Sequence, residues 1–261
     1  MQNNGKPLIT IVIPVKNEAR SIQDLINTVD ENLPRLTHEI IVVDDGSSDN
    51  TRQIAESILP AGQVISHARN LGKGAAMKTG AKHAKSDIIV FIDGDGAHSP
   101  GDIPALVSPI LEKKATLVNG SRTLPGASVS NSKLKRRLSN GVASIVITII
   151  ISFFLPAVTL ARVPFKFRKI TDCTSGFRAI TYQAWRKLNL TSEGFQIETE
   201  IIYEAARNNF VIAEVPIDCN WNPNFSRLSI VRDGFTTSRL LLKKLAGDFG
   251  GRQNHRAGNS R

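Results

Sequence analysis

The sequence is poor in the residues that form covalent or metal-held frameworks. Its 261 residues include two cysteines, Cys173 and Cys219, and no C-x-x-C pair. This argues against a disulfide framework or a zinc site and predicts a reducing compartment. The first ten residues lack the basic and apolar regions of a signal peptide. The N-x-S/T sequons that begin at Asn119, Asn189 and Asn224 are therefore interpreted as chance matches.

Two common nucleotide-binding signatures are missing as well. The stretch NLGKGAA, residues 70–76, fits neither G-x-x-x-x-G-K-[ST] nor G-x-G-x-x-G, which argues against an ATPase or a dinucleotide enzyme. Its glycines precede a predicted helix, so it is still a candidate phosphate loop with Lys73 in it. Aromatic residues make up 6% of the chain and lie mostly in apolar runs, which is unlike a stacking platform for single-stranded nucleic acid.

Positive charge, in contrast, is in excess. The formal net charge is +10, and basic residues gather at 133–137, at 162–169 and in the C-terminal tail. Such clusters favour phosphate-rich partners or an anionic membrane surface. The alternative is an ordinary solvated surface.

The first 120 residues alternate between strand and helix patterns. Apolar, β-branched runs predict strands at 8–15, 39–45, 62–67, 87–93 and 115–122, and amphipathic runs between them predict helices at 18–33, 49–59, 72–84 and 100–113. Runs without internal alternation are typical of strands buried on both faces. The expected fold class is α/β, a doubly wound and mostly parallel sheet with helices on both faces. Farther on, we expect helices at 194–209 and 235–247 and a strand at 210–217.

Polar clusters follow three of these strands. PVKNE follows the first, DDGSSD the second and DGDG the fourth, and the carboxyl ends of parallel strands share one edge where ligands bind. The D-x-D pair Asp93 and Asp95 could hold Mg²⁺ or Mn²⁺ against a diphosphate. Gly94 and Gly96 would let a ligand approach the backbone, although Asp and Gly are also typical of a plain turn.

The cluster DDGSSD can likewise be interpreted as a ligand-binding site or as a turn. Asp44 and Asp45 could accept hydrogen bonds from a base or a ribose. The alternative is a turn followed by a helix cap, for which Asp49 is the candidate.

The order of seven motifs is what points to a family. VIPVKNEA, IVVDDGSSD, NLGKGAA, FIDGDGAHSPGDI, NGSR, DCTSGFRAI and SRLSIVRDG together resemble the family 2 glycosyltransferases over roughly residues 8–235. More narrowly, they resemble polyprenyl (dolichyl) phosphate sugar synthases. The resemblance implies a GT-A fold and an inverting transfer of a sugar from a UDP- or GDP-sugar to a polyprenyl phosphate, with Mg²⁺ or Mn²⁺ as cofactor.

The resemblance also assigns roles by position. The donor-binding set is Pro14, Glu18, Asp45, Lys73, Asp93, Gly94, Asp95, Arg122 and Arg227. Asp93 and Asp95 would hold the metal, and Asp95 would be catalytic through it. Two positions depart from the family pattern. Ala97 stands where relatives often have a metal-holding Gln, so water would fill in, and Trp221 stands where some relatives have Arg.

The acceptor side is assigned less directly. Asp172 would position the acceptor or take a residual proton, and Glu198 and Glu200 are weaker candidates that do not share a helix face. For Glu200 the alternative is a solvated position. The lipid phosphate would be bound by basic and hydroxyl side chains, for which the candidates are Arg136, Arg137, Ser139 and Arg232.

Residues 141–161 carry no charge and are long enough to cross a bilayer as a helix. A single straight crossing would place DGDG and DCTSGFR on opposite sides of the membrane, although the resemblance puts both in one active site. We therefore expect a helix in the membrane interface, kinked near Pro156, on a peripheral protein at the cytoplasmic face. The alternative is an apolar helix buried between two copies of the chain in a homo-oligomer.

These expectations divide the chain into a nucleotide-sugar half (1–125), a membrane-interface segment (126–170), an acceptor-side half (171–235) and a C-terminal helix with a basic tail (236–261). Nucleic acid is not expected as a partner. Two other functions are open: transfer to a soluble acceptor, and nucleotide binding without catalysis.

Overall fold

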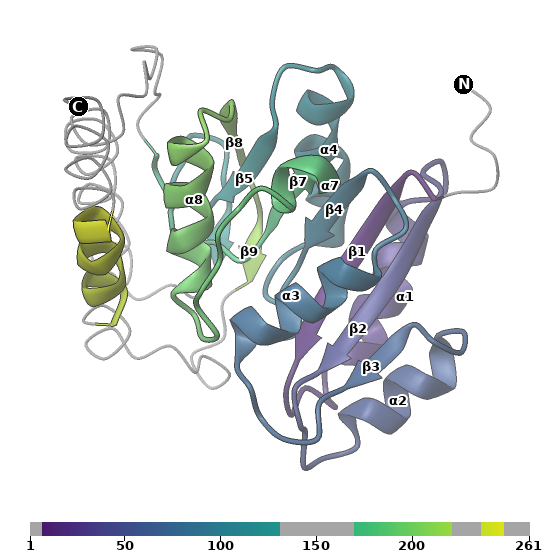
Figure 1. Ribbon diagram of the computed structural model, residues 1–261. Coiled ribbons are helices and arrows are strands. Elements are labelled where there is room, and N and C mark those ends of the chain that lie inside the picture. Colours follow the sequence, from purple (N-terminus) through teal and green to yellow (C-terminus); the bar gives the residue numbers. More distant parts are fainter. Residues whose placement is uncertain (1–6, 131–169, 221–235, 248–261) are drawn as a thin grey trace, which may run out of the picture.

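The computed structural model describes residues 7–130, 170–220 and 236–247, and Figure 1 shows their arrangement. The described residues form one seven-stranded sheet in the order β3-β2-β1-β4-β7-β5-β8. In chain order its strands are β1 (Ile9–Val15), β2 (His38–Asp44), β3 (Val64–Ser66), β4 (Ile88–Phe91), β5 (Leu117–Ser121), β7 (Arg178–Thr181) and β8 (Ile212–Pro216). All five strands predicted in the first 122 residues are present, and β8 confirms the strand predicted at 210–217.

The sheet is mostly parallel, as predicted. β1 pairs parallel with β2 and β4, β2 pairs parallel with β3, and β5 pairs parallel with β8. Strand β7 runs antiparallel to both neighbours, β4 and β5. Because β7 comes from the DCTSGFRAI motif, the chain on either side of residues 131–169 contributes to the same sheet.

Helices cover both faces of the sheet (Figure 1). The helices α1 (Ile22–Asn32), α2 (Thr51–Ile58) and α4 (Ile103–Leu111) pack on one face, and α3 (Lys73–His83) and α8 (Ile197–Arg207) pack on the other. The apolar stripe of α1 is buried against the sheet, as its spacing predicts. The predicted C-terminal helix is present at residues 236–247 and packs Leu241 and Leu245 into the same core cluster as α8.

Shorter elements complete the described chain. They are the 3₁₀ turn η1 (Pro100–Asp102), the helix α7 (Tyr182–Trp185) and a two-stranded sheet of β6 (Val129–Ser130) and β9 (Cys219–Asn220). Both cysteines are buried, and no disulfide joins them.

Strands β1 and β4 separate at their carboxyl ends. Their pairing stops at Val12 and Phe91, whereas β1 stays paired with β2 as far as Val15. Pro14 lies in this last part of β1. Proline has no backbone N–H to donate, and β1 is no longer paired with β4 at this position. The loops after β1 and β4 therefore open onto the same space, at a switch point of the sheet where α/β proteins bind ligands.

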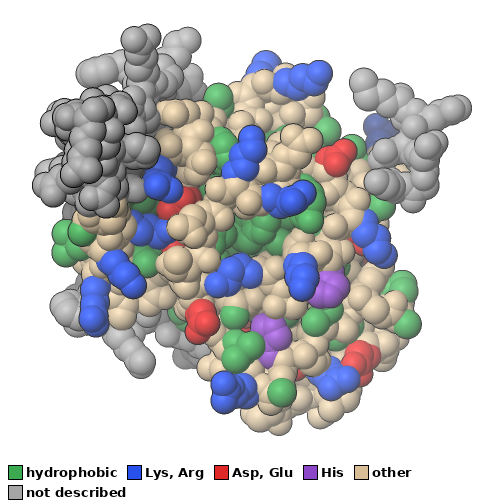
Figure 2. All heavy atoms as spheres, viewed as in Figure 1, with side chains coloured by type: hydrophobic (Ala, Val, Ile, Leu, Met, Phe, Trp, Pro, Cys, Tyr) green, Lys and Arg blue, Asp and Glu red, His purple; other side chains and the backbone are tan. Residues whose placement is uncertain are grey.

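Residues 131–169 lie outside the described residues, and with them most of the expected interface segment. Among the residues that are described, no helix is long and apolar enough to cross a membrane. Figure 2 shows Lys and Arg scattered over the visible face, with Asp and Glu between them. The basic clusters of the sequence belong mainly to ranges that are not described.

Candidate active site

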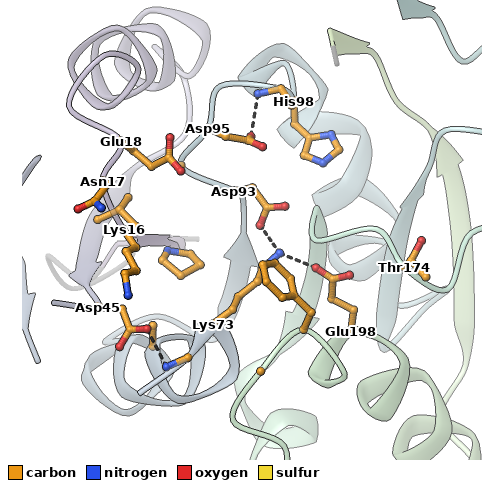
Figure 3. Close-up of a pocket in the computed structure, with 18 of the residues that line it drawn as sticks. Lys16, Asn17, Glu18, Asp45, Lys73, Asp93, Asp95, His98, Thr174 and Glu198 are labelled. Atoms are coloured by element: carbon orange, nitrogen blue, oxygen red, sulfur yellow. Dashed lines mark hydrogen bonds and ion pairs between the residues drawn. The ribbon is translucent and has the colours of Figure 1, made fainter. Parts of the chain in front are cut away.

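A cavity of about 470 Å³ lies at the carboxyl ends of β1, β2 and β4 (Figure 3). It collects residues from the ends of β1, β2, β4 and β5, from the start of α3 and from the start of α8. Eight of the predicted donor and metal residues line it: Pro14, Glu18, Asp45, Lys73, Asp93, Gly94, Asp95 and Arg122. In Figure 3 the side chains of Lys16, Glu18 and Asp45 lie across the cavity from those of Glu198 and Thr174.

Lys73 lies in the wall of the cavity, between two carboxylates. Its Nζ is 2.5 Å from Asp93 Oδ1 and also donates to Glu198 Oε1, and it lies 5.5 Å from the centre of the Phe195 ring. Burial by itself would lower the pKa of Lys73, but the charges of Asp93 and Glu198 outweigh it and raise that pKa. Burial likewise opposes ionisation of Asp93, yet the Lys73 charge holds the pKa of Asp93 below its usual value.

Asp95 is in the opposite situation. Burial and the neighbouring Asp93 charge raise the pKa of Asp95, while the backbone N–H of Ala97 donates to its Oδ1 at 3.0 Å. Two adjacent carboxylates, one of them poorly compensated, make a site at which a cation is strongly favoured.

The cavity as a whole is anionic, although the protein is basic. Five carboxylates and three cationic side chains line it: Glu18, Asp45, Asp93, Asp95 and Glu198 against Lys16, Lys73 and Arg122. A nucleoside diphosphate would add further negative charge, so its binding here requires a compensating cation.

The carboxylates of the D-x-D pair are hard oxygen ligands, which suit Mg²⁺ or Mn²⁺. Within the described ranges no three His, Cys, Asp or Glu side chains come together as a complete metal shell. The pair therefore fits a divalent cation whose remaining ligands are water and substrate oxygens, in agreement with the Ala97 position.

His98 is a cavity residue that the sequence did not single out. It is buried, its ring lies 5.4 Å from the Phe177 ring, and its Nδ1 has no hydrogen-bond partner among the described residues. Burial lowers the pKa of His98 to about 4, so the ring is neutral at pH 7. Its position three residues after Asp95 indicates a place near the D-x-D pair, but only the fold shows that His98 lines the cavity.

Arg122 enters the cavity held by Asp172. Its Nε and Nη2 donate to the two oxygens of that carboxylate at 2.7 and 2.9 Å, and its backbone N–H donates at 3.2 Å. Asp172 is fully buried and does not line the cavity. Burial opposes its ionisation, but the Arg122 charge keeps the pKa of Asp172 below its usual range.

This geometry corrects the role predicted for Asp172. A carboxylate that is already bound on both oxygens and has a lowered pKa is a poor proton acceptor. Asp172 is a positioning residue for Arg122 and makes no direct contact with the cavity.

The NLGKGAA stretch is not a phosphate loop in its backbone. The N–H groups of Leu71 and Gly72 donate to the two oxygens of Asp45 at 2.8 and 2.7 Å. Those of Gly74 and Ala75 donate to the carbonyl of Glu193 at 2.6 and 3.2 Å. These four donors are satisfied within the protein, so the predicted phosphate loop is wrong and Lys73 faces the cavity through its side chain alone.

Asp45 therefore has a second task beside its place in the cavity wall. Its carboxylate fixes the loop before α3. His67 Nδ1 lies 2.8 Å from Asp45 Oδ1, the oxygen that also accepts from Leu71 N. Asp44, the other carboxylate of that motif, accepts from Ser47 N in a turn. Asp49 accepts from Thr51 N at 3.1 Å, but the N-cap position of α2 is Asn50, so the cap predicted at Asp49 is one residue off.

Two glycines are explained by close packing of the site. A Cβ on Gly94 would lie 2.4 Å from Val15 Cγ1, so this glycine lets the β4 loop pack on β1. Gly94 also lines the cavity, so the close approach of a ligand predicted for it stays a prediction. A Cβ on Gly176 would lie 2.5 Å from both oxygens of Asp93. The DCTSGFRAI motif thus packs directly against the carboxylate of Asp93 at Gly176.

Glu198 and Glu200 point to different places, as expected for i, i+2 on a helix. Glu198 lines the cavity. Glu200 is fully buried away from it, accepts from Thr191 N at 2.9 Å and pairs with Lys244 at 2.9 Å. The solvated alternative for Glu200 is therefore wrong, and this residue anchors the C-terminal helix.

Several predicted residues lie outside the described residues. These are Arg227 and Trp221 on the donor side and Arg136, Arg137, Ser139 and Arg232 on the acceptor side. Their assignments stay predictions.

Known proteins are similar to this chain in sequence or in fold. The chain resembles a UDP-N-acetylglucosamine–dolichyl-phosphate N-acetylglucosaminyltransferase of Methanococcus voltae, with 29% identity over 91% of this chain and 96% of that protein. It also resembles a dolichol-phosphate mannosyltransferase of Pyrococcus furiosus, with 31% identity over 80% of this chain and 55% of that protein. Among solved structures, the glucosyl-3-phosphoglycerate synthase of Mycobacterium tuberculosis, solved with Mn²⁺ and UDP, superposes with a TM-score of 0.65 at 22% identity, over 94% of this chain and 80% of that one.

The family comparison agrees with these likenesses. Residues 10–188 match the model of glycosyl transferase family 2. This range contains every strand end of the cavity and the whole D-x-D pair. The chain therefore belongs to glycosyl transferase family 2 and is a glycosyltransferase.

Proposed function

We propose that the protein is an inverting hexosyltransferase that moves a sugar from a UDP- or GDP-sugar to a polyprenyl (dolichyl) phosphate at the cytoplasmic face of a membrane. The observation that carries the donor half is the anionic cavity with its D-x-D pair at the β1–β4 switch point. The acceptor half is supported by the Methanococcus voltae and Pyrococcus furiosus relatives, whose names specify dolichyl phosphate.

The donor would lie along the cavity with its diphosphate near Asp93 and Asp95. A divalent cation bound there would offset the charge that develops on the leaving nucleoside diphosphate. Arg122 is fixed by Asp172 with its guanidinium at the cavity, and a planar guanidinium is suited to phosphate oxygens. Because Asp172 holds Arg122 in place before the donor arrives, little side-chain entropy is lost when the donor binds.

The acceptor chemistry places few demands on the protein. A lipid phosphate is already an anion near neutral pH, so transfer to it does not require a strong general base. This agrees with the position of Asp172, which is committed to Arg122. The uncharged stretch 141–161 and its basic flanks would bring the enzyme to the membrane surface where such an acceptor is found.

A transfer assay tests this proposal. Purified protein, Mn²⁺ and a polyprenyl phosphate in detergent are incubated with labelled UDP-glucose, UDP-N-acetylglucosamine or GDP-mannose, and each reaction is repeated with chelator. A chelator-sensitive lipid product from one donor is the expected result. A product formed on a water-soluble acceptor such as phosphoglycerate, with none on the lipid, would overturn the acceptor assignment. Donor binding without any transfer would favour a nucleotide-binding protein.

A further inference from the structure

In the proposed function two cations bind the Asp93 carboxylate: the Lys73 ammonium and the divalent metal ion. One of its oxygens is already bound by the Lys73 ammonium at 2.5 Å, and the same carboxylate is half of the D-x-D pair. A divalent cation on that pair would be close to the ammonium, and two cations that share one carboxylate repel each other strongly in a partly buried site. The occupant of Asp93 therefore depends on where Lys73 can go.

Lys73 cannot avoid this competition by moving into water. Its side chain is 11% exposed and lies in the cavity wall at the first residue of α3. The backbone around it is fixed, because Gly72 and Gly74 on either side both donate to protein acceptors. Only the flexible four-carbon side chain is free to shift.

Glu198 offers the ammonium a second place. It is buried at the start of α8, and its Oε1 already accepts from Lys73 Nζ. Its backbone is held as well, since Arg178 Nη1 donates to the Glu198 carbonyl at 2.8 Å. The Lys73 ammonium thus lies between the carboxylates of Asp93 and Glu198, as Figure 3 shows.

We propose that Lys73 is the resident counter-ion of Asp93 in the donor-free enzyme, that it competes with the divalent cation for that carboxylate, and that Glu198 holds the ammonium when the cation binds. This inference rests on the proposed function and adds to it two positioning residues that set cation affinity. In the donor-free state the ammonium keeps the D-x-D carboxylates from repelling each other. In the loaded state Glu198 keeps the displaced ammonium neutralised within the cavity wall.

The two residues then have opposite effects on cation affinity. Lys73→Met removes the competitor, so Mn²⁺ binding without donor should tighten by about tenfold or more. Glu198→Gln removes the second place for the ammonium, so Lys73 binds Asp93 more strongly and Mn²⁺ affinity should fall by about fivefold or more. In the Lys73→Met background, Glu198→Gln should change the affinity less than twofold, because no ammonium remains to be held.

The readout is the dissociation constant of Mn²⁺, measured on the full chain from the electron paramagnetic resonance signal of the free ion, without donor. Lys16→Met is the matched control, since it removes one positive charge from the same cavity and Lys16 makes no contact with Asp93. It should change Mn²⁺ affinity by less than about twofold. Circular dichroism spectra and melting temperatures establish that each variant is folded.

A second measurement uses the wild-type protein alone. The ¹⁵N resonance of the Lys73 ammonium should shift in proportion to Mg²⁺ binding, because the ammonium leaves Asp93. An unchanged resonance at saturating Mg²⁺ would overturn the proposal even if a variant failed to fold.

The outcomes separate this inference from the proposed function. If wild-type protein binds Mn²⁺ and Lys73→Met binds it no more tightly, the competition is refuted and the proposed function stands. If Glu198→Gln lowers the affinity by the same factor with and without Lys73, Glu198 acts through its own charge and the second step is refuted. If wild-type protein binds no Mn²⁺ with or without UDP, the cation site of the proposed function is itself refuted.

Discussion

Replacing Asp172 by alanine is expected to lower the free energy of unfolding by about 3–5 kcal/mol, the usual cost of leaving one member of a buried ion pair alone. Asp172 is fully buried, and the bidentate contact with Arg122 at 2.7 and 2.9 Å would be lost. Asp172→Asn keeps the shape and part of the hydrogen bonding, so a smaller loss of about 1–3 kcal/mol is expected. Natural domains have about 5–15 kcal/mol in total, so either loss is readily measured.

A double-mutant cycle isolates the pair itself. Arg122→Met and Asp172→Ala each leave one buried charge uncompensated, whereas the double variant leaves neither. The double variant should therefore lose less stability than the two single losses combined, by about 1–3 kcal/mol. Urea unfolding followed by circular dichroism provides the four free energies.

The pH dependence of the free energy of unfolding tests whether the Asp172 stabilisation is electrostatic in origin. The pKa of Asp172 is lowered in the folded protein, because the Arg122 charge outweighs burial. Its stabilisation is thus complete above the unfolded pKa of about 3.9 and is lost as the pH falls through the folded value. The difference in stability between wild type and Asp172→Asn should be constant from about pH 5 to 8 and should narrow below about pH 4. A loss under about 1 kcal/mol for Asp172→Ala, or a gap that does not depend on pH, would refute this account of Arg122 positioning.

Three further changes probe the rest of the site. Gly176→Ala places a methyl group against the Asp93 carboxylate, so transfer should fall more than tenfold while the melting temperature changes by only a few degrees; a normal rate would contradict that packing. Lys244→Met leaves Glu200 without its cation, so the free energy of unfolding measured in urea should fall by about 3 kcal/mol. An unchanged free energy of unfolding would mean that this contact does not anchor the C-terminal helix. Asp45→Ala frees the two amides that it holds in the loop before α3, so their hydrogen exchange should accelerate well beyond that of the sheet, and unchanged protection would refute the loop-fixing role.

Much of the sheet could be predicted because its signals are local. Strands β1, β2 and β4 are mainly apolar runs, and each run is followed by polar residues that parallel pairing brings to one edge. The cavity follows from that edge, which is why eight predicted residues line it. The reversed strand β7 was not predicted, since nothing in DCTSGFRAI indicates that it inserts between β4 and β5.

The errors have a common physical cause, which is a partner far away in the sequence. The N–H groups at the start of α3 looked available for phosphate, but their acceptor, Glu193, is about 120 residues farther on. Glu200 looked solvated because its cation, Lys244, belongs to the C-terminal helix. Asp172 looked like a base because the motif alone does not show that Arg122 occupies both of its oxygens.

The proposed function requires that the cavity bind a nucleoside diphosphate through a cation held by Asp93 and Asp95. Calorimetric titration of UDP and GDP into the wild-type protein and into Asp95→Ala, each with and without Mn²⁺, tests it most directly. We expect one of the two nucleotides to bind wild-type protein much more tightly with Mn²⁺, and we expect Asp95→Ala to lose this gain while it keeps its fold. Equal binding with and without Mn²⁺, or an undiminished gain in Asp95→Ala, would contradict it.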